Sequence, residues 1–199
     1  ISLLLCLVAS SVAAKPTVVD IDDLRSNDQQ RQAALIITQV MERFHYRKPS
    51  LDDGMSQAIF DRYLEALDPN RSFFSETDIA RFATYRNEMD DSLRTGRLKP
   101  AFRIFRRFRE LVELRAAYAV EVLEKDNFDF ARDETYTFDR SEAEWLPDAA
   151  ALDDLWRRRV KNDILSLRLS GEEGEEVIKT LTKRYEGIAR RVAQMDAED

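Results

Sequence analysis

The sequence has few of the residues that build disulfides, metal sites and tight turns. Its 199 residues include one cysteine, Cys6, one histidine, His45, five glycines and five prolines. One cysteine excludes an internal disulfide, and one histidine with one cysteine is too few for a metal site built from those residues. So few glycines and prolines argue against a turn-rich β protein, and 35% charged residues favour long solvated helices. We interpret His45 as a residue at a helix end.

Basic charge and long apolar runs are also scarce. The formal net charge of -7 argues against a nucleic-acid partner, because binding to phosphates needs a basic surface. After residue 14, no stretch approaches the roughly 20 apolar residues of a membrane span. The 44% of hydrophobic residues recur at regular spacing, which argues against disorder. We therefore expect an ordered, soluble chain once the first residues are removed.

Those first residues form the one long apolar run. Residues 1–14, "ISLLLCLVASSVAA", end in small side chains, with Val12 and Ala14 where a signal peptidase cuts, and the sequence turns polar after Lys15. A short buried helix is the alternative. We predict that residues 1–14 are a signal peptide, and Cys6 would be removed with it.

The spacing of apolar residues predicts an all-α, orthogonal or bundle-like domain of about six helices over residues 27–199, after an extended lead-in at 15–26. The first helix carries its apolar residues on one face, which comprises Ala33, Ile37, Val40 and Phe44. The predicted helices cover about 28–46, 51–67, 76–93, 100–125, 150–169 and a last segment that begins within 172–176. This last helix has no stop signal before Asp199, which predicts that the natural chain continues and that this one is truncated.

Prolines, glycines and capping residues mark the boundaries. Pro69 ends the second helix, Gly96 ends the third, and Pro100 suits the first turn of the fourth. Two helices begin with a serine followed three residues later by an aspartate, as in a capping box: Ser50 with Asp53, and Ser75 with Asp78.

Residues 126–148 form an irregular insertion. Tyr136 and Phe138 alternate around Thr137, which allows one short extended segment. Trp145, just before Pro147, is expected to hold this loop against the helices.

Candidate catalytic groups have simpler structural interpretations. No strand-to-helix turn with flanking glycines presents a serine nucleophile. Capping explains the paired acids better than acid–base chemistry does. These pairs are Asp22-Asp23, Asp52-Asp53, Asp90-Asp91 and Asp153-Asp154.

The run "FRIFRRFRE" at 102–110 interleaves aromatics with arginines, a pattern that also occurs in nucleic-acid-binding proteins. A helical wheel instead places Ile104, Phe105 and Phe108 on one face and Arg103, Arg106 and Arg107 on the other. We predict that these arginines form a solvated face.

Two charged residues lie inside apolar stripes. Arg115 falls in the stripe of the fourth predicted helix, and Asp163 falls in that of the fifth. We predict that both are buried or half-buried polar anchors that fix how the helices dock. The alternative for Arg115 is a side chain that extends along the surface to solvent.

Two adjacent phenylalanines, Phe73 and Phe74, occupy the connection between the second and third helices. We predict that at least one ring turns inward and plugs the corner between these helices. The alternative is an exposed patch that awaits another domain.

The chain contains four long, distinctive blocks: "RFHYRK" at 43–48, "IFDRYLEALDPNRSFF" at 59–74, "LWRRRVKNDILSLRLSG" at 155–171 and "LTKRYEGIARRVAQMDAED" at 181–199. In this order they resemble the N-terminal region of the tail-specific proteases, the carboxy-terminal processing peptidases of the Gram-negative periplasm. The resemblance spans nearly the whole chain after residue 14.

The resemblance implies a helical N-terminal domain followed by a PDZ domain and a peptidase domain with a serine nucleophile and a lysine base. This chain ends before either domain begins, so no residue in it is assigned a catalytic, cofactor-binding or metal-binding role. In particular, Lys161 is not assigned the role of the lysine base. The implied partners are the PDZ and peptidase domains of the same chain, periplasmic substrate proteins and an adaptor protein. The rival interpretations are a free-standing periplasmic helical binding module and a small hydrolase complete in these residues.

Overall fold

The computed structural model describes residues 18–44, 50–125 and 128–195, and this part of the chain is all-α. It contains seven α-helices, two short 3-10 helices and no strand, which confirms the predicted fold class. None of the described helices is long and apolar enough to cross a bilayer. The elements are η1 (Ile21–Asp23), α1 (Asp28–Phe44), α2 (Asp53–Leu67), α3 (Glu76–Phe82), η2 (Ala83–Tyr85), α4 (Met89–Thr95), α5 (Lys99–Lys125), α6 (Ala149–Leu169) and α7 (Glu175–Gln194).

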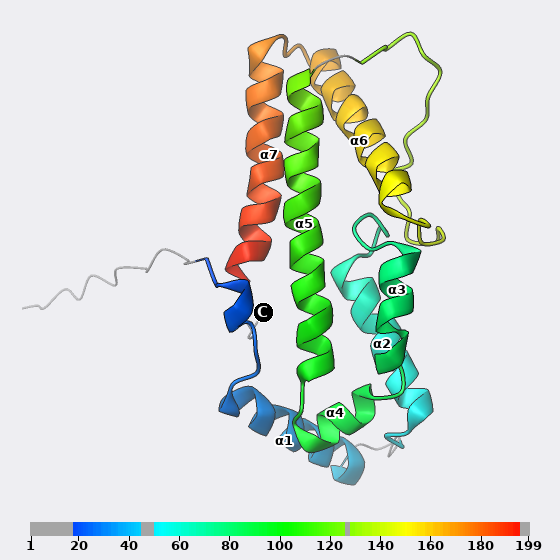
Figure 1. The fold of residues 1–199 in the computed structure, drawn as a ribbon, viewed down its shortest axis with the longest axis vertical. Helices are drawn as coiled ribbons and strands as arrows, with labels where there is room; N and C mark the ends of the chain where they lie inside the picture. Colours follow the sequence, from blue (N-terminus) through cyan, green and yellow to red (C-terminus); the bar gives the residue numbers. More distant parts are fainter. Residues whose placement is uncertain (1–17, 45–49, 126–127, 196–199) are drawn as a thin grey trace, which may run out of the picture.

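Helix α5 is the spine of the molecule (Figure 1). Its 27 residues span about 40 Å at the usual rise of 1.5 Å per residue. Helix α7 runs antiparallel beside it, α6 packs at an angle against its second half, and α2 and α3 lie beside its first half. Helices α1 and α4 cross the lower end of this spine in Figure 1. The two ends of the described chain meet, because the Val19 amide donates to the Ala193 carbonyl at 3.1 Å.

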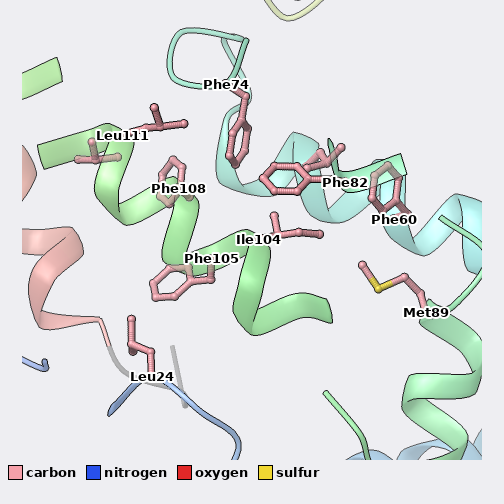
Figure 2. Packing of buried hydrophobic residues seen from close by; sticks show 11 residues of the cluster. Leu24, Phe60, Phe74, Phe82, Met89, Ile104, Phe105, Phe108 and Leu111 are labelled. Carbon is pink, nitrogen blue, oxygen red and sulfur yellow. The ribbon is translucent and has the colours of Figure 1, made fainter. Parts of the chain in front are cut away.

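Two hydrophobic cores share this spine. The first surrounds the N-terminal half of α5 and includes Phe60, Phe74, Phe82, Ile104 and Phe108 (Figure 2). The second surrounds the C-terminal half and is made of α5, α6 and α7 residues, among them Ala119, Leu123, Trp156, Leu181 and Tyr185.

Phe73 and Phe74 stand where the two cores meet. Phe74 is fully buried and its ring lies edge-on to that of Phe82, with the centroids 5.5 Å apart. Phe73 is half-buried and packs against Phe108 of the first core and Trp156 of the second, with the ring centroids 5.5 Å apart in each pair. The predicted plug is therefore confirmed for Phe74, and Phe73 joins the cores.

Most predicted boundaries are confirmed, with corrections to the cap of α2, to the helix predicted over 76–93 and to the last helix, which ends at Gln194 with Met195 extended and does not run on. Helix α2 ends before Pro69, Gly96 ends α4 in the left-handed conformation (φ 65°), and Ser75 forms the predicted capping box of α3 with Asp78. The cap of α2 is Asp52 and not Ser50: its carboxylate accepts from the Met55 amide at 3.1 Å. Asp52 is the residue directly before α2, so its side chain reaches an amide of the first turn that has no partner within the helix, whereas Ser50 lies two residues further out.

The single helix predicted over 76–93 is wrong. It breaks after Phe82 into α3, η2 and α4. A buried serine of α2 stabilises the break, because the Ser56 hydroxyl donates to the Arg86 carbonyl and accepts from the Met89 amide, both at 2.8 Å. The backbone groups that a continuous helix would pair internally are thus satisfied from another helix.

The lead-in and the irregular loop differ in detail from the predictions. Residues 21–23 of the lead-in form a 3-10 turn and are not extended. Residues 136–138 form no strand. The Tyr136 and Phe138 rings pack against each other with their centroids 5.1 Å apart. The loop meets the helices instead at an isolated bridge to Ser75 and at Trp145, whose ring packs 6.1 Å from Phe74, so the role predicted for Trp145 is confirmed.

Candidate functional site

The described residues assemble no evident catalytic or metal centre. Within the described ranges, no group of three or more His, Cys, Asp or Glu side chains is placed to hold a metal ion. His45 and Cys6 lie outside those ranges, so what we predicted for them stays a prediction. The candidates that remain are charged side chains buried between helices and one apolar helix face that is not buried at all.

Lys161 illustrates how the buried charges are used. Only 9% of this residue is exposed, and its ammonium donates to Glu134 at 2.7 Å. Arg157 also donates to the Glu134 carboxylate, and its bonds together with that of Lys161 lower the pKa of Glu134 to about 2. Both cations thus hold Glu134 of the loop against α6, and this geometry makes Lys161 an anchor between the two.

Arg115 is the polar anchor that we predicted, with a partner that the sequence did not reveal. It is 2% exposed and forms an ion pair with Asp153 of α6, whose side chain is 44% exposed. The alternative, an arginine lying along the surface, is wrong for its side chain. Because Asp153 remains hydrated, however, the pair is not dry, and its loss should cost less than that of a fully buried pair.

Asp163 is the second predicted anchor, and it binds α7. The Tyr185 hydroxyl donates to its carboxylate at 2.7 Å, and Arg184 lies 3.8 Å away. Burial, followed by the nearby Asp163 charge, raises the pKa of Tyr185, so this phenol keeps its proton and remains a donor. The bond fixes the rotation of α7 against α6.

The predicted solvated arginine face of α5 is confirmed for Arg103, which is exposed, and wrong for Arg106 and Arg107, which are half-buried and bind other segments. Arg106 donates to the Leu24 carbonyl at 2.7 and 2.9 Å, and Arg109, which is 4% exposed, donates to the Val19 carbonyl. Arg107 bonds Asp78 of α3 at 2.9 Å. Burial by itself raises the pKa of Asp78, but the bonds from Ser75 and Arg107 together hold it below its usual value.

Among the paired acids, the predicted capping role is confirmed only for Asp52. Asp52 caps α2, and Asp22 and Asp23 lie in the first turn of η1. Asp153 and Asp154 bind different arginines, so the pair does not act as a unit.

Sequence reasoning missed Asp68, which organises the phenylalanine pair. This residue is 1% exposed, and its carboxylate accepts from the amides of Ser72, Phe73 and Phe74 at 2.8, 2.8 and 2.9 Å. The available signal was an aspartate just before Pro69 in a turn, since aspartates in turns often bind amides that follow them.

The apolar face of α1 is the largest departure from a closed domain. Its large side chains point outward: Ile36, Ile37, Val40 and Phe44 are 58, 56, 49 and 78% exposed. The buried positions of α1 are Ala34 and Thr38. We call the four exposed residues the α1 outer face. It includes three of the four residues that the sequence places on one apolar face.

Comparison with known proteins agrees with this picture of a domain made for a larger protein. Residues 37–199 match the sequence model of the family described as the tail specific protease N-terminal domain. The chain is also 34% identical over 190 residues to the tail-specific protease of Haemophilus influenzae (strain ATCC 51907 / DSM 11121 / KW20 / Rd), an alignment that covers 94% of this chain and 27% of that protein. The chain therefore belongs to the tail-specific protease family, of which it carries the N-terminal domain.

Proposed function

We propose that this chain is the non-catalytic N-terminal domain of a periplasmic serine endopeptidase that degrades or processes proteins from their C-termini. Its relative from Haemophilus influenzae is a tail-specific protease, and the chain spans only 27% of that protein's length. The serine nucleophile and lysine base of the parent protein would then lie in the part that this chain does not cover.

The main observation behind this proposal is that the buried charged side chains are paired with partners on other segments. Lys161, the one buried lysine among the described residues, is held by Glu134, and Arg115 and Asp163 each bind a side chain of another helix. Groups that are used to fix helices in place are poorly suited to exchange protons with a substrate. Together with the long α5 spine, they favour a rigid scaffold that shapes access to a protease body.

The periplasmic location rests on the first residues and on composition. Residues 1–14 have the pattern of a signal peptide. No cysteine follows Cys6, so an oxidising compartment would have no thiol of residues 15–199 to oxidise.

A second role, the docking of a separate protein, is favoured by one surface feature. A groove of about 710 Å³ lies between α5 and α7, with a floor that includes Ala116, Val120 and Ala189 and a rim rich in glutamates. This groove would also serve a free-standing binding module. Reading the gene beyond Asp199 separates these possibilities, because a stop codon there supports the module and a PDZ and peptidase sequence supports the protease.

The direct test compares residues 15–199 with the full-length protein in a peptidase assay on a substrate protein with an accessible C-terminus. We expect turnover by the full-length protein and none by residues 15–199. A Lys161→Arg variant of the full-length protein keeps the charge beside Glu134 but cannot act as a lysine base, so it should retain activity. Turnover by residues 15–199, or loss of activity in a folded Lys161→Arg variant, would contradict the proposal.

A further inference from the structure

The α1 outer face is a contiguous exposed apolar patch on one helix. Single exposed apolar residues are common on proteins, but these four lie within two and a half turns of one helix. Their exposed fractions correspond to an apolar patch on the order of 400 Å², which is within the range of functional patches. On the same side of α1 by helical spacing, Gln29, Gln32 and Ala33 are exposed and uncharged and Arg43 is charged, whereas the exposed charges Asp28, Arg31 and Glu42 lie outside that side.

The patch is held in a defined orientation. Helix α1 is capped reciprocally, since the Gln30 amide donates to the Asn27 side chain at 2.8 Å and the Asn27 amide donates to the Gln30 side chain at 2.9 Å. Its inner side meets α4, where Arg94 binds Glu42 at 3.4 Å. At Gly96 the two helices approach so closely that an added Cβ would lie 3.1 Å from the Arg31 carbonyl oxygen. The outer face is thus presented by a helix that cannot simply roll over to bury it.

The size of the patch decides between a tethered and an untethered occupant. A stable complex between separate molecules buries about 800 Å² on each partner, roughly twice this patch. A second copy of the chain would therefore gain too little from this face alone to repay the entropy of association. A segment of the same polypeptide pays much less of that cost, because its effective concentration is on the order of millimolar.

The remaining chain is also placed to reach the patch. The relative from Haemophilus influenzae extends well beyond the matched region, which is 27% of its length. Helix α7 ends beside the half of α5 near which α1 lies (Figure 1), and the last described residue, Met195, packs on the first core. A polypeptide that continues from there starts on the same half of the molecule as the α1 outer face.

We propose that the α1 outer face is an intramolecular docking surface, covered in the full-length protein by an apolar, charge-poor surface of the polypeptide that follows residue 199. This inference rests on the proposal that the chain is part of a longer protease. It assigns to Ile36, Ile37, Val40 and Phe44 a role that the described domain does not use.

Thiol labelling of the full-length protein tests the inference. Val40→Cys is a small change at a half-exposed site, and Gln39→Cys places a thiol on the neighbouring exposed position, turned away from the outer face. Residues 15–199 contain no other cysteine, so labelling with a maleimide can be followed on the peptide that holds each new thiol. We expect labelling at position 40 to be at least about tenfold slower than at position 39, because a covered site reacts only when it opens. Equal rates would overturn the inference.

Further measurements show whether the face is covered by the same polypeptide or by a second copy, and whether a negative result contradicts this inference or the proposed function. Protection that disappears on dilution, in step with dissociation seen by sedimentation, would show that a second copy covers the face and would also overturn the inference. In the full-length protein, Ile37→Glu should lower the thermal midpoint, whereas Gln39→Glu should leave it unchanged; equal midpoints would count against docking. Peptidase activity is measured on the same preparations: an active protein with an unprotected position 40 rejects this inference and leaves the proposed function standing.

Discussion

Substitution of Asp68 should destabilise the domain far more than an equivalent substitution at the other end of the same helix. Asp68 follows the last residue of α2, and Asp52 precedes the first. Both carboxylates accept backbone amides, but Asp68 is buried and accepts three, whereas Asp52 is exposed and accepts that of Met55. The two sites therefore form a matched pair for the same chemical change.

The expected magnitude follows from the bonds of each oxygen. One Asp68 oxygen accepts from Ser72, and the other accepts from Phe73 and Phe74. An asparagine keeps one of these sets and turns its NH₂ group toward the other, so Asp68→Asn should lose about 2–3 kcal/mol, as expected for a charge-assisted bond replaced by two facing donors. Asp68→Ala frees all three amides and should lose about 3–5 kcal/mol, a large part of the 5–15 kcal/mol that stabilises a typical domain. Asp52→Asn should change little, because asparagine is an equally good N-cap.

The assay is urea unfolding of residues 15–199 at pH 7, followed by circular dichroism at 222 nm. The slopes should be equal among the variants, so that shifted midpoints report stability. Amide exchange at Ser72, Phe73 and Phe74 gives a local check, since the amides that face the new NH₂ group should exchange faster in Asp68→Asn than in Asp52→Asn. If Asp68→Asn lies within about 0.5 kcal/mol of Asp52→Asn, the turn does not depend on its carboxylate and the reasoning is refuted.

Two further predictions concern the other anchors. Arg115→Ala should lower the free energy of unfolding by about 2–3 kcal/mol, which is less than for a dry ion pair because Asp153 is half-exposed. Arg115→Met should restore most of this lost stability, because methionine refills the volume. Equal losses in both variants would show that the charge, and not the packing, decides the stability. Because the folded-state pKa of Glu134 is about 2, below the usual 4.5, its contribution should be complete above about pH 5 and lost as the pH falls from 4.5 toward 2. The gap in unfolding midpoint between the unmodified chain and Glu134→Gln should thus close at low pH, and a gap that stays constant from pH 7 to pH 3 would contradict it.

Local signals in the sequence were enough to predict most helix ends. Pro69, Gly96 and the Ser75–Asp78 capping box act within a few residues of the backbone that they control, and the structure confirms each. The break between α3 and α4 was beyond such reasoning. It depends on Ser56, thirty residues earlier, whose hydroxyl meets the freed backbone groups only after α2 has packed.

The arginines of α5 show the same limit for side chains. A helical wheel says correctly that Arg106 and Arg107 are not on the apolar face, but it does not say what lies opposite them. In the structure Arg106 meets the carbonyl oxygen of Leu24, more than eighty residues away in sequence. The charges along one helix do not show whether an arginine binds water or such a distant partner, because both can accept the hydrogen bonds of its guanidinium.

The exposed face of α1 follows from how the N-terminal segments are attached. Residues 19–24 are held by guanidinium bonds from Arg106 and Arg109 to main-chain carbonyls, and α1 is positioned by its polar cap and by Arg94. Helices are usually positioned by burying their apolar stripe. Here polar contacts act together with the buried side of α1, which includes Ala34, and with its close approach to Gly96, so the outer stripe is not needed to hold the helix and stays available. The apolar periodicity of α1 was read correctly, and under the docking proposal the surface that it faces belongs to a part of the protein beyond these residues.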